Sequence, residues 1–93
     1  MVAFDPILID DQRQRVNGVF LGPVRWHIFA LLWKRMDRWV ARSSIRQQLP
    51  HYMDKEAHPR TIDVHIHYIR KALSGTPYKI EMRYEFGYRM VKP

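Results

Sequence analysis

The clearest hydrophobic pattern lies between residues 60 and 73, where large aliphatic side chains recur at offsets of four, three and four. These side chains are Ile62, Ile66, Ile69 and Leu73. Because an α-helix has about 3.6 residues per turn, this spacing places them all on one side of a helix. Burial of each is worth about 1.5–3 kcal/mol. The pattern therefore predicts a helix over residues 60–73 that is held firmly against a core.

The opposite side of this predicted helix has an unusual composition. An ordinary solvated face more often carries pairs of Glu and Lys, whereas this one combines cations, polar groups and two side chains with apolar bodies. Its members are Arg60, Val64, His67, Tyr68 and Lys71, with Thr61, His65 and Arg70 on the flanks. We interpret this outer face as a recognition surface.

Residues 1–36 predict a small sheet followed by a buried helix. Short apolar runs within 1–21 are separated by turn signals, of which Asn17-Gly18 is the strongest, and they indicate an antiparallel meander. Pro23 suits the first turn of a helix, and the segment 24–36 is apolar on nearly all sides. We predict that this segment is the central helix, with its tryptophans in the core.

The remaining segments predict a short helix and a terminal hairpin. Ser43 or Ser44 can cap a helix that runs to Leu49, and residues 44–47 have the spacing of a capping box. Residues 78–83 and 88–91 alternate in polarity, as paired strands do. Two consecutive helices followed by a hairpin are the layout of a winged helix-turn-helix. In such a domain the second helix enters the major groove of DNA.

Composition narrows the class of partner. The chain has 93 residues, which suits one domain over 1–93, and 46% of them are hydrophobic. Lys and Arg total 16 against 9 acidic residues, a net charge of +7 that favours nucleic acid, an anionic membrane surface or an acidic protein. The chain contains no cysteine, which excludes disulfides and thiolate chemistry. No apolar run is long enough to span a bilayer, and we expect a soluble intracellular protein without membrane association.

Three stretches resemble the OmpR/PhoB-type winged-helix effector domain of bacterial response regulators. The family's recognition helix reads R-T-V-D-V-H-I-x-x-L-R-K-x-L, its wing closes with G-Y-R, and its first helix begins at L-T-P-x-E-F. The matching residues here are Arg60-Thr61-Ile62-Asp63-Val64-His65-Ile66 with Ile69-Arg70-Lys71-Ala72-Leu73, then Gly87-Tyr88-Arg89, and Leu21-Gly22-Pro23-Val24-Arg25-Trp26. The resemblance implies an α+β winged helix-turn-helix that regulates transcription from the bacterial nucleoid in the cytoplasm.

The resemblance also implies which residues contact DNA and other partners. Helix 60–73 would lie in the major groove, and wing 78–91 on the backbone or minor groove. The candidates are Arg60, Thr61, Val64, His65, His67, Tyr68, Arg70, Lys71, Arg83, Tyr84 and Arg89. RNA polymerase would contact the loop that holds Asp54, Lys55 and Glu56. A small single domain further suggests a homodimer on tandem half-sites.

The chain departs from the family pattern at several of these positions. Many members carry basic residues where His67 and Tyr68 stand, and a Glu where Arg25 stands. The family's wing commonly reads R-G-x-G-Y-R, but here Glu85 replaces its first glycine and Arg83 lies one position early. Strand alternation then turns Arg83 toward the other face of the hairpin. The 93 residues also leave no room for a phosphoacceptor receiver domain.

Individual side chains suggest specific roles in such an interface. The apolar parts of Thr61 and Val64 suit the thymine methyl group, and Tyr68 can donate a hydrogen bond or stack. Asp63 is interpreted as a residue that orients a nearby cation, for which Arg70 lies two turns further along the same side. His65 and His67 point about 200° apart and do not share a metal ion.

No catalytic constellation and no cofactor motif is present, so an enzyme is not expected. Two other functions remain open at the level of sequence. One is an adaptor that binds RNA polymerase or another transcription protein and contacts DNA weakly. The other is binding to DNA without sequence preference.

Overall fold

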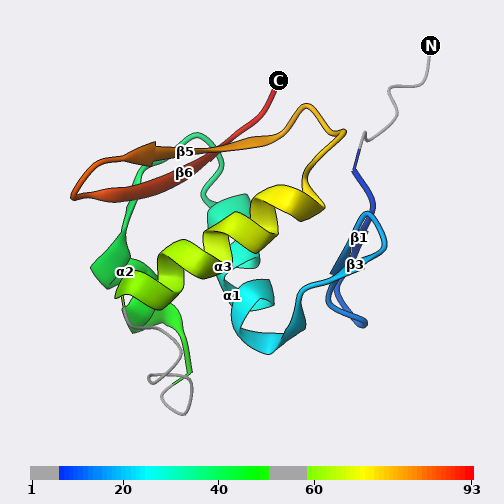
Figure 1. The fold of residues 1–93 in the computed structure, drawn as a ribbon, viewed down its shortest axis with the longest axis horizontal. Coiled ribbons are helices and arrows are strands. Elements are labelled where there is room, and N and C mark those ends of the chain that lie inside the picture. The colour runs from blue at the N-terminus through cyan, green and yellow to red at the C-terminus, as the bar shows by residue number, and fades with distance from the viewer. Residues whose placement is uncertain (1–6, 51–58) are drawn as a thin grey trace.

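The computed structural model describes residues 7–50 and 59–93, in which two small antiparallel sheets flank three helices (Figure 1). The elements in chain order are β1 (Ile9–Asp10), β2 (Arg15–Val16), β3 (Val19–Phe20), α1 (Gly22–Lys34), β4 (Val40–Ala41), α2 (Arg42–Gln48), α3 (Pro59–Ala72), β5 (Lys79–Arg83) and β6 (Gly87–Val91). This arrangement confirms the predicted α+β winged helix. No helix in the described ranges combines the length and apolar character needed to cross a membrane.

The N-terminal sheet is the predicted meander, and it is joined to the end of α3. Strands β1, β2 and β3 pair in that order, and the turn between β2 and β3 is Asn17-Gly18 with φ of 51° and 78°. The Asn17 side chain accepts a hydrogen bond from the backbone of Leu8 at 2.9 Å. Its Nδ2 donates to the carbonyl of Ala72 at 3.3 Å, which satisfies one of the last carbonyls of α3.

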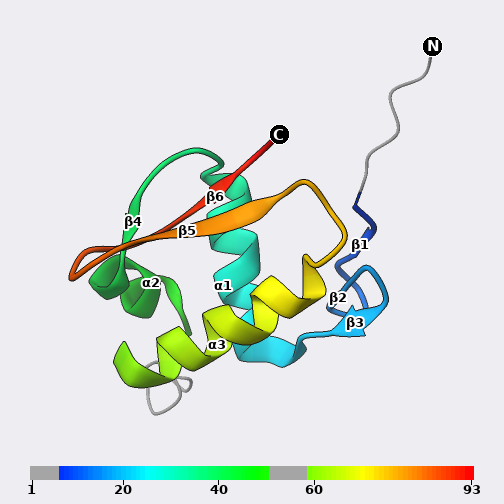
Figure 2. The same ribbon diagram turned by 45° about the horizontal axis from the view of Figure 1, so that its top comes forward.

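Helix α1 crosses behind α3 and fills the centre of the domain (Figure 2). It begins two residues earlier than predicted, and Pro23 lies in its first turn as expected. Phe29 is 1% exposed and contacts Trp26 and Trp33, with ring centroids 5.6 and 5.7 Å away. Both tryptophans pack against the buried cluster. Phe29 is therefore a core residue, as the sequence predicted, whereas the two tryptophans are half-buried at the edge of the core.

Helix α2 begins at Arg42, and the predicted serine cap is wrong. Ala41 is the N-cap residue, and no side chain bonds to the exposed N–H groups of the first turn. The reason is that β4 leads directly into α2, with Ala41 still extended at φ −65° and ψ 148°. The N–H of Arg42 donates to the carbonyl of Phe86 at 3.0 Å, so the hairpin satisfies a donor of this helix end.

The C-terminal sheet has one strand more than predicted. β5 and β6 form the expected hairpin, but β4 adds to the other edge of β6, giving the order β4-β6-β5. In this sheet Ala41 lies opposite Gly87. A Cβ on Gly87 would lie 1.9 Å from the carbonyl oxygen of Val40, so only glycine fits there.

Helix α3 packs its aliphatic stripe on α1 and the sheet. Ile62, Ile66 and Ile69 are at most 1% exposed, and Leu73 is 3% exposed. The helix runs from Pro59 to Ala72, within one residue of the predicted range. The chain turns away at Gly75, whose φ of 86° suits glycine. The stripe therefore anchors α3 as predicted and leaves its opposite side exposed.

Candidate nucleic-acid interface

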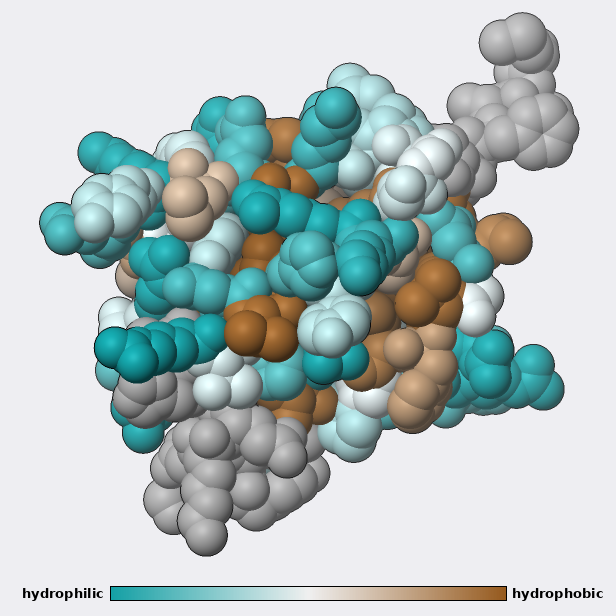
Figure 3. Space-filling model, in the orientation of Figure 1, coloured by the Kyte–Doolittle hydropathy of each residue, from teal (hydrophilic) through white to brown (hydrophobic). Residues whose placement is uncertain are grey.

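The outer face of α3 is exposed to solvent along its length. Val64 and Tyr68 are 51% and 41% exposed, and the other exposed members are Arg60, His67 and Lys71. Thr61 is half-buried, and His65 is buried at 9% exposure. In the view of Figure 1, α3 lies across the front of α1, and the same face in Figure 3 combines hydrophilic and hydrophobic side chains. The side chains predicted to face outward on α3 are therefore exposed, with Thr61 half-buried and His65 buried at the edge of this face.

One flank of α3 is bonded to α2 and the wing through Asp63. Arg42 donates from Nε to Asp63 Oδ1 at 3.2 Å, and the Tyr88 hydroxyl donates to the same oxygen. Arg42 also donates from Nη2 to the Tyr88 hydroxyl at 3.4 Å. Asp63 thus orients a cation, as the sequence suggested. The cation is Arg42 from the preceding helix, and Arg70 is engaged elsewhere.

Burial and the Asp63 carboxylate both raise the pKa of Tyr88 above its usual value of 10.0. Burial disfavours the charged phenolate, and the carboxylate accepts the phenolic proton and repels the charge that would remain. Arg42 acts in the opposite direction but does not reverse the shift. Tyr88 is therefore a proton donor to Asp63 throughout the neutral range.

This raised pKa predicts a loss of stability at alkaline pH that Tyr88→Phe should reduce. Above pH of about 10, tyrosine in the unfolded chain loses its proton while Tyr88 in the folded chain keeps it, so the free energy of unfolding falls as pH rises. The stabilisation that the raised pKa of Tyr88 provides is fully present below pH of about 10. It is lost as the pH rises through the pKa of Tyr88 in the folded chain. Tyr88→Phe should cost about 1 kcal/mol at neutral pH, because Asp63 loses a donor, but should then decline less steeply.

Urea unfolding at pH 7 to about 11 would measure both effects. Tyr84→Phe is the matched control, because Tyr84 is 79% exposed at the wing tip. An equally steep alkaline decline in wild type and Tyr88→Phe would contradict the role assigned to Tyr88.

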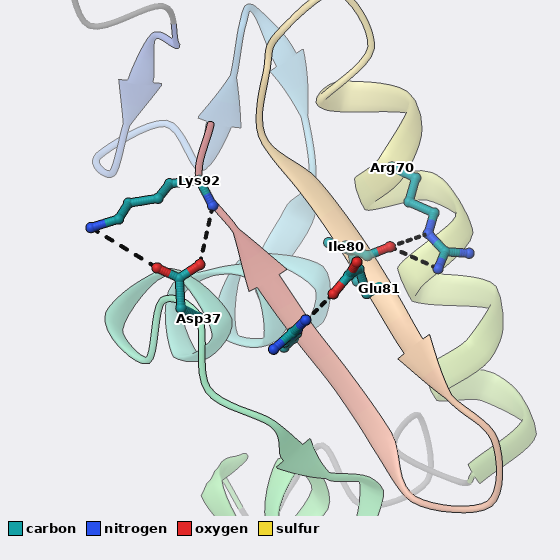
Figure 4. Close-up of polar contacts among 6 residues, drawn as sticks. Asp37, Arg70, Ile80, Glu81 and Lys92 are labelled. Carbon is teal, nitrogen blue, oxygen red and sulfur yellow. Dashed lines mark hydrogen bonds and ion pairs between the residues drawn. The ribbon is translucent and has the colours of Figure 1, made fainter.

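Two predicted DNA-binding arginines are occupied in holding the fold together, and Figure 4 labels the first of them, Arg70. Arg70 donates from Nε and Nη2 to the carbonyl of Ile80 at 3.2 and 2.9 Å, which joins α3 to β5. Arg89 bonds to Glu81 at 2.6 Å and lies 4.6 Å above the ring of Trp39. The Arg70 contact thus holds α3 against the wing, and the Arg89 contact joins the two strands of the wing.

The predicted contact residues in the wing strands lie on the face of the sheet that is turned away from α3. Tyr88 is buried toward α3, so by strand alternation Arg89 lies on the opposite face of the sheet. Arg83 and Glu81 share that opposite face, because they pair with Gly87 and Arg89 in the same register. Arg83 therefore points away from α3 together with Arg89, and strand alternation alone did not show which face of the hairpin packs on α3.

The wing tip presents aromatic side chains around a strained residue. Tyr84 and Phe86 are 79% and 41% exposed, and the Arg83 guanidinium lies 5.6 Å above the Phe86 ring. Glu85 has φ of 60°, the left-handed conformation that costs a side chain about 1–2 kcal/mol relative to glycine. The family glycine that Glu85 replaces therefore corresponds to a position where the turn requires positive φ.

The other flank of α3 contacts Arg25 from the first turn of α1. Arg25 Nε donates to His65 Nδ1 at 3.1 Å, and its guanidinium carbon lies 4.0 Å from the centre of the Tyr68 ring. Lys71 Nζ lies 5.5 Å from the same ring. Sequence reasoning noted the unusual identities of Arg25 and Tyr68 separately but missed that the fold brings them together.

The predicted protein-partner residues Asp54, Lys55 and Glu56 lie outside the described residues. Within the described ranges, no group of three or more His, Asp or Glu side chains is placed to hold a metal ion.

Comparison with known families identifies the domain. The family model described as "Transcriptional regulatory protein, C terminal" matches residues 16–90, from β2 to β6. The chain belongs to this family. It is therefore a DNA-binding domain of the OmpR/PhoB type from a transcriptional regulator, as the resemblance implied, and the family is not one of enzymes. No match was found among curated proteins.

Proposed function

We propose that this domain binds double-stranded DNA with sequence preference, with α3 in the major groove and hairpin β5–β6 against the backbone and adjacent minor groove. The main support is the contrast between the two sides of α3. One side is fully buried, whereas the other exposes Val64, His67, Tyr68 and Lys71. A helix of this diameter fits the major groove of B-form DNA.

The exposed side chains suit two kinds of contact. Val64 and the methyl group of Thr61 offer apolar contact to thymine, and the Tyr68 hydroxyl can donate to a base acceptor. Arg60 and Lys71 lie toward opposite ends of the face and would contact phosphates, which position the helix without reading sequence. The sequence-specific and the non-specific contributions to DNA affinity would thus come from different residues of one helix.

The bonds on both flanks of α3 support sequence reading. Asp63 is bonded to α2 and the wing, and Arg70 to β5. These contacts lie within the domain itself, so we expect little conformational entropy of the helix to be lost on binding. A pre-ordered helix discriminates between base pairs because misplaced groups cannot relax around a mismatch.

The proposal also covers how many copies of the domain bind DNA and where in the cell they act. A single domain of this size covers one short half-site, so we propose that two copies bind side by side on a repeated sequence. Such binding would place the protein on the bacterial chromosome. Contact with RNA polymerase would add the step that regulates transcription.

Selection of bound duplexes from a random pool tests the proposal. We expect a repeated motif, which Val64→Ala should relax at one base pair because the thymine contact is lost. Arg60→Ala with Lys71→Ala should instead weaken binding about 10- to 100-fold for all duplexes, with the motif retained.

Leu8→Ala in the N-terminal sheet is a control for Val64→Ala, because it removes an exposed aliphatic side chain away from α3. Binding without an enriched motif would contradict sequence reading, and negligible binding would favour an adaptor that contacts a transcription protein.

A further inference from the structure

Arg25 lies outside the recognition helix and the wing, yet it reaches the outer face of α3. It is half-buried in the first turn of α1, and its Nε–H is bonded to His65 on the flank of α3. His65 is itself buried, so this bond fixes where the guanidinium lies. The α1 helix therefore adds a permanently charged group beside the residues that face DNA.

The guanidinium also restricts the ring of Tyr68. It lies 4.0 Å from the ring centre, within the range of an attractive contact between a cation and an aromatic face. Lys71 approaches the same ring at 5.5 Å, and His67 meets it edge-on at 5.6 Å. Although Tyr68 is 41% exposed, its ring is thus held by three neighbours.

Arg25 retains hydrogen-bonding capacity for an anion. A guanidinium carries five N–H groups in a planar fork, and the bond to His65 uses the one on Nε. The amino groups on Nη1 and Nη2 suit the two oxygens of a phosphate. Where the family usually has a Glu that would repel DNA, this chain therefore carries a group able to bind it.

We propose that Arg25 is a positioning and phosphate-binding residue of the DNA interface, which holds the Tyr68 ring for base contact and anchors the flanking DNA backbone. The proposal rests on the proposed DNA binding and assigns a third element, α1, to that interface. It links two departures from the family pattern: Arg25 in place of Glu, and Tyr68 in place of a basic residue. Loss of a cation on α3 is accompanied by gain of a cation on α1.

Binding of the selected duplex, measured over a range of salt concentrations, tests this role. Arg25→Gln should lower affinity about 5- to 10-fold near 0.1 M salt and reduce the log–log salt slope by about one, because one phosphate contact is lost. Motif selection with the same variant should relax preference at the base pairs that Tyr68→Leu also relaxes. The double variant Arg25→Gln with Tyr68→Leu should relax these positions no further than Tyr68→Leu alone.

Arg25→Lys separates the two parts of the role. It keeps the charge and should keep the salt slope, but an ammonium lacks the planar face that stacks on Tyr68, so the base preference should still relax. Arg38→Gln is the matched control, because it removes one exposed positive charge between α1 and β4. Thermal unfolding of each variant excludes loss of fold as the cause of any change.

The inference is overturned if Arg25→Gln matches Arg38→Gln in salt slope and selected motif while Arg60→Ala and Lys71→Ala still weaken binding. In that case the proposed function stands and α1 has no part in it. If the wild-type domain binds no duplex, the proposed function and the inference both fail. Should Arg25→Gln not fold, an Arg25→Lys variant that folds and selects the wild-type motif would overturn the positioning role.

Discussion

Gly87→Ala is expected to lower the free energy of unfolding by about 3 kcal/mol or more, which is a large part of the stability of a domain this size. The new Cβ would meet the Val40 carbonyl oxygen at 1.9 Å and the Ala41 Cα at 2.9 Å. These are backbone atoms in a paired strand, so no side-chain rotation can remove the clash. β4 must therefore separate from β6, and the N–H of Arg42 then loses its bond to the hairpin.

Thermal unfolding would show this loss as a decrease in Tm of roughly 12 °C or more. Gly18→Ala is the matched control, because Gly18 has φ of 78° but no atom lies within 4 Å of the place that the added methyl group would take. That variant should lose only the cost of a left-handed alanine, about 1 kcal/mol. Equal losses in the two variants would show that β4 does not constrain Gly87.

DNA affinity is expected to fall about 250- to 1,000-fold between 50 and 200 mM salt, which corresponds to a log–log slope of about −4 to −5. This slope follows from about four to six phosphate contacts, each of which releases condensed counterions from the duplex. With a net charge of +7, the chain has enough cations even though Arg70 and Arg89 already bond within the protein.

Fluorescence anisotropy with a labelled duplex, repeated over this salt range, gives the slope directly. Lys71→Ala should reduce its magnitude by about one, whereas Lys34→Ala, an exposed position in the last turn of α1 outside α3 and the wing, should leave it nearly unchanged. A slope close to zero would rule out phosphate contacts as the source of affinity, whatever the family membership implies.

Local patterns allowed much of the fold to be predicted. The spacing of Ile62, Ile66 and Ile69 placed α3 within one residue, and Asn17-Gly18 located the hairpin between β2 and β3. Features that depend on distant segments were not predictable in this way. β4 has only two residues, Val40 and Ala41, and its strand character comes from pairing with β6 far along the chain. The same pairing displaced the expected serine cap of α2.

The candidate site shows the same division between local and distant information. Helical spacing was sufficient to predict which residues α3 exposes, because Val64 and Tyr68 lie opposite a strong aliphatic stripe. Helical spacing does not show which residues of other elements lie nearby. For this reason the sequence did not identify Arg42 as the partner of Asp63, or Arg25 as the neighbour of Tyr68. Such contacts require that helix crossings be known.

The three-stranded C-terminal sheet also fixes the distance between α3 and the wing, the two elements that would contact DNA. β4 leads into α2 and pairs with β6 of the wing, and Asp63 of α3 is bonded to Tyr88 of β6. Backbone pairing in the sheet and the side-chain bond from Tyr88 to Asp63 thus set the distance between the recognition helix and the wing. Replacement of outward side chains such as Val64 or Tyr84 can then change which bases are read while the interval between the contacts stays constant. On the proposed mode of binding, side-chain identity would decide which bases are contacted, and the fold would decide how far apart the contacts lie.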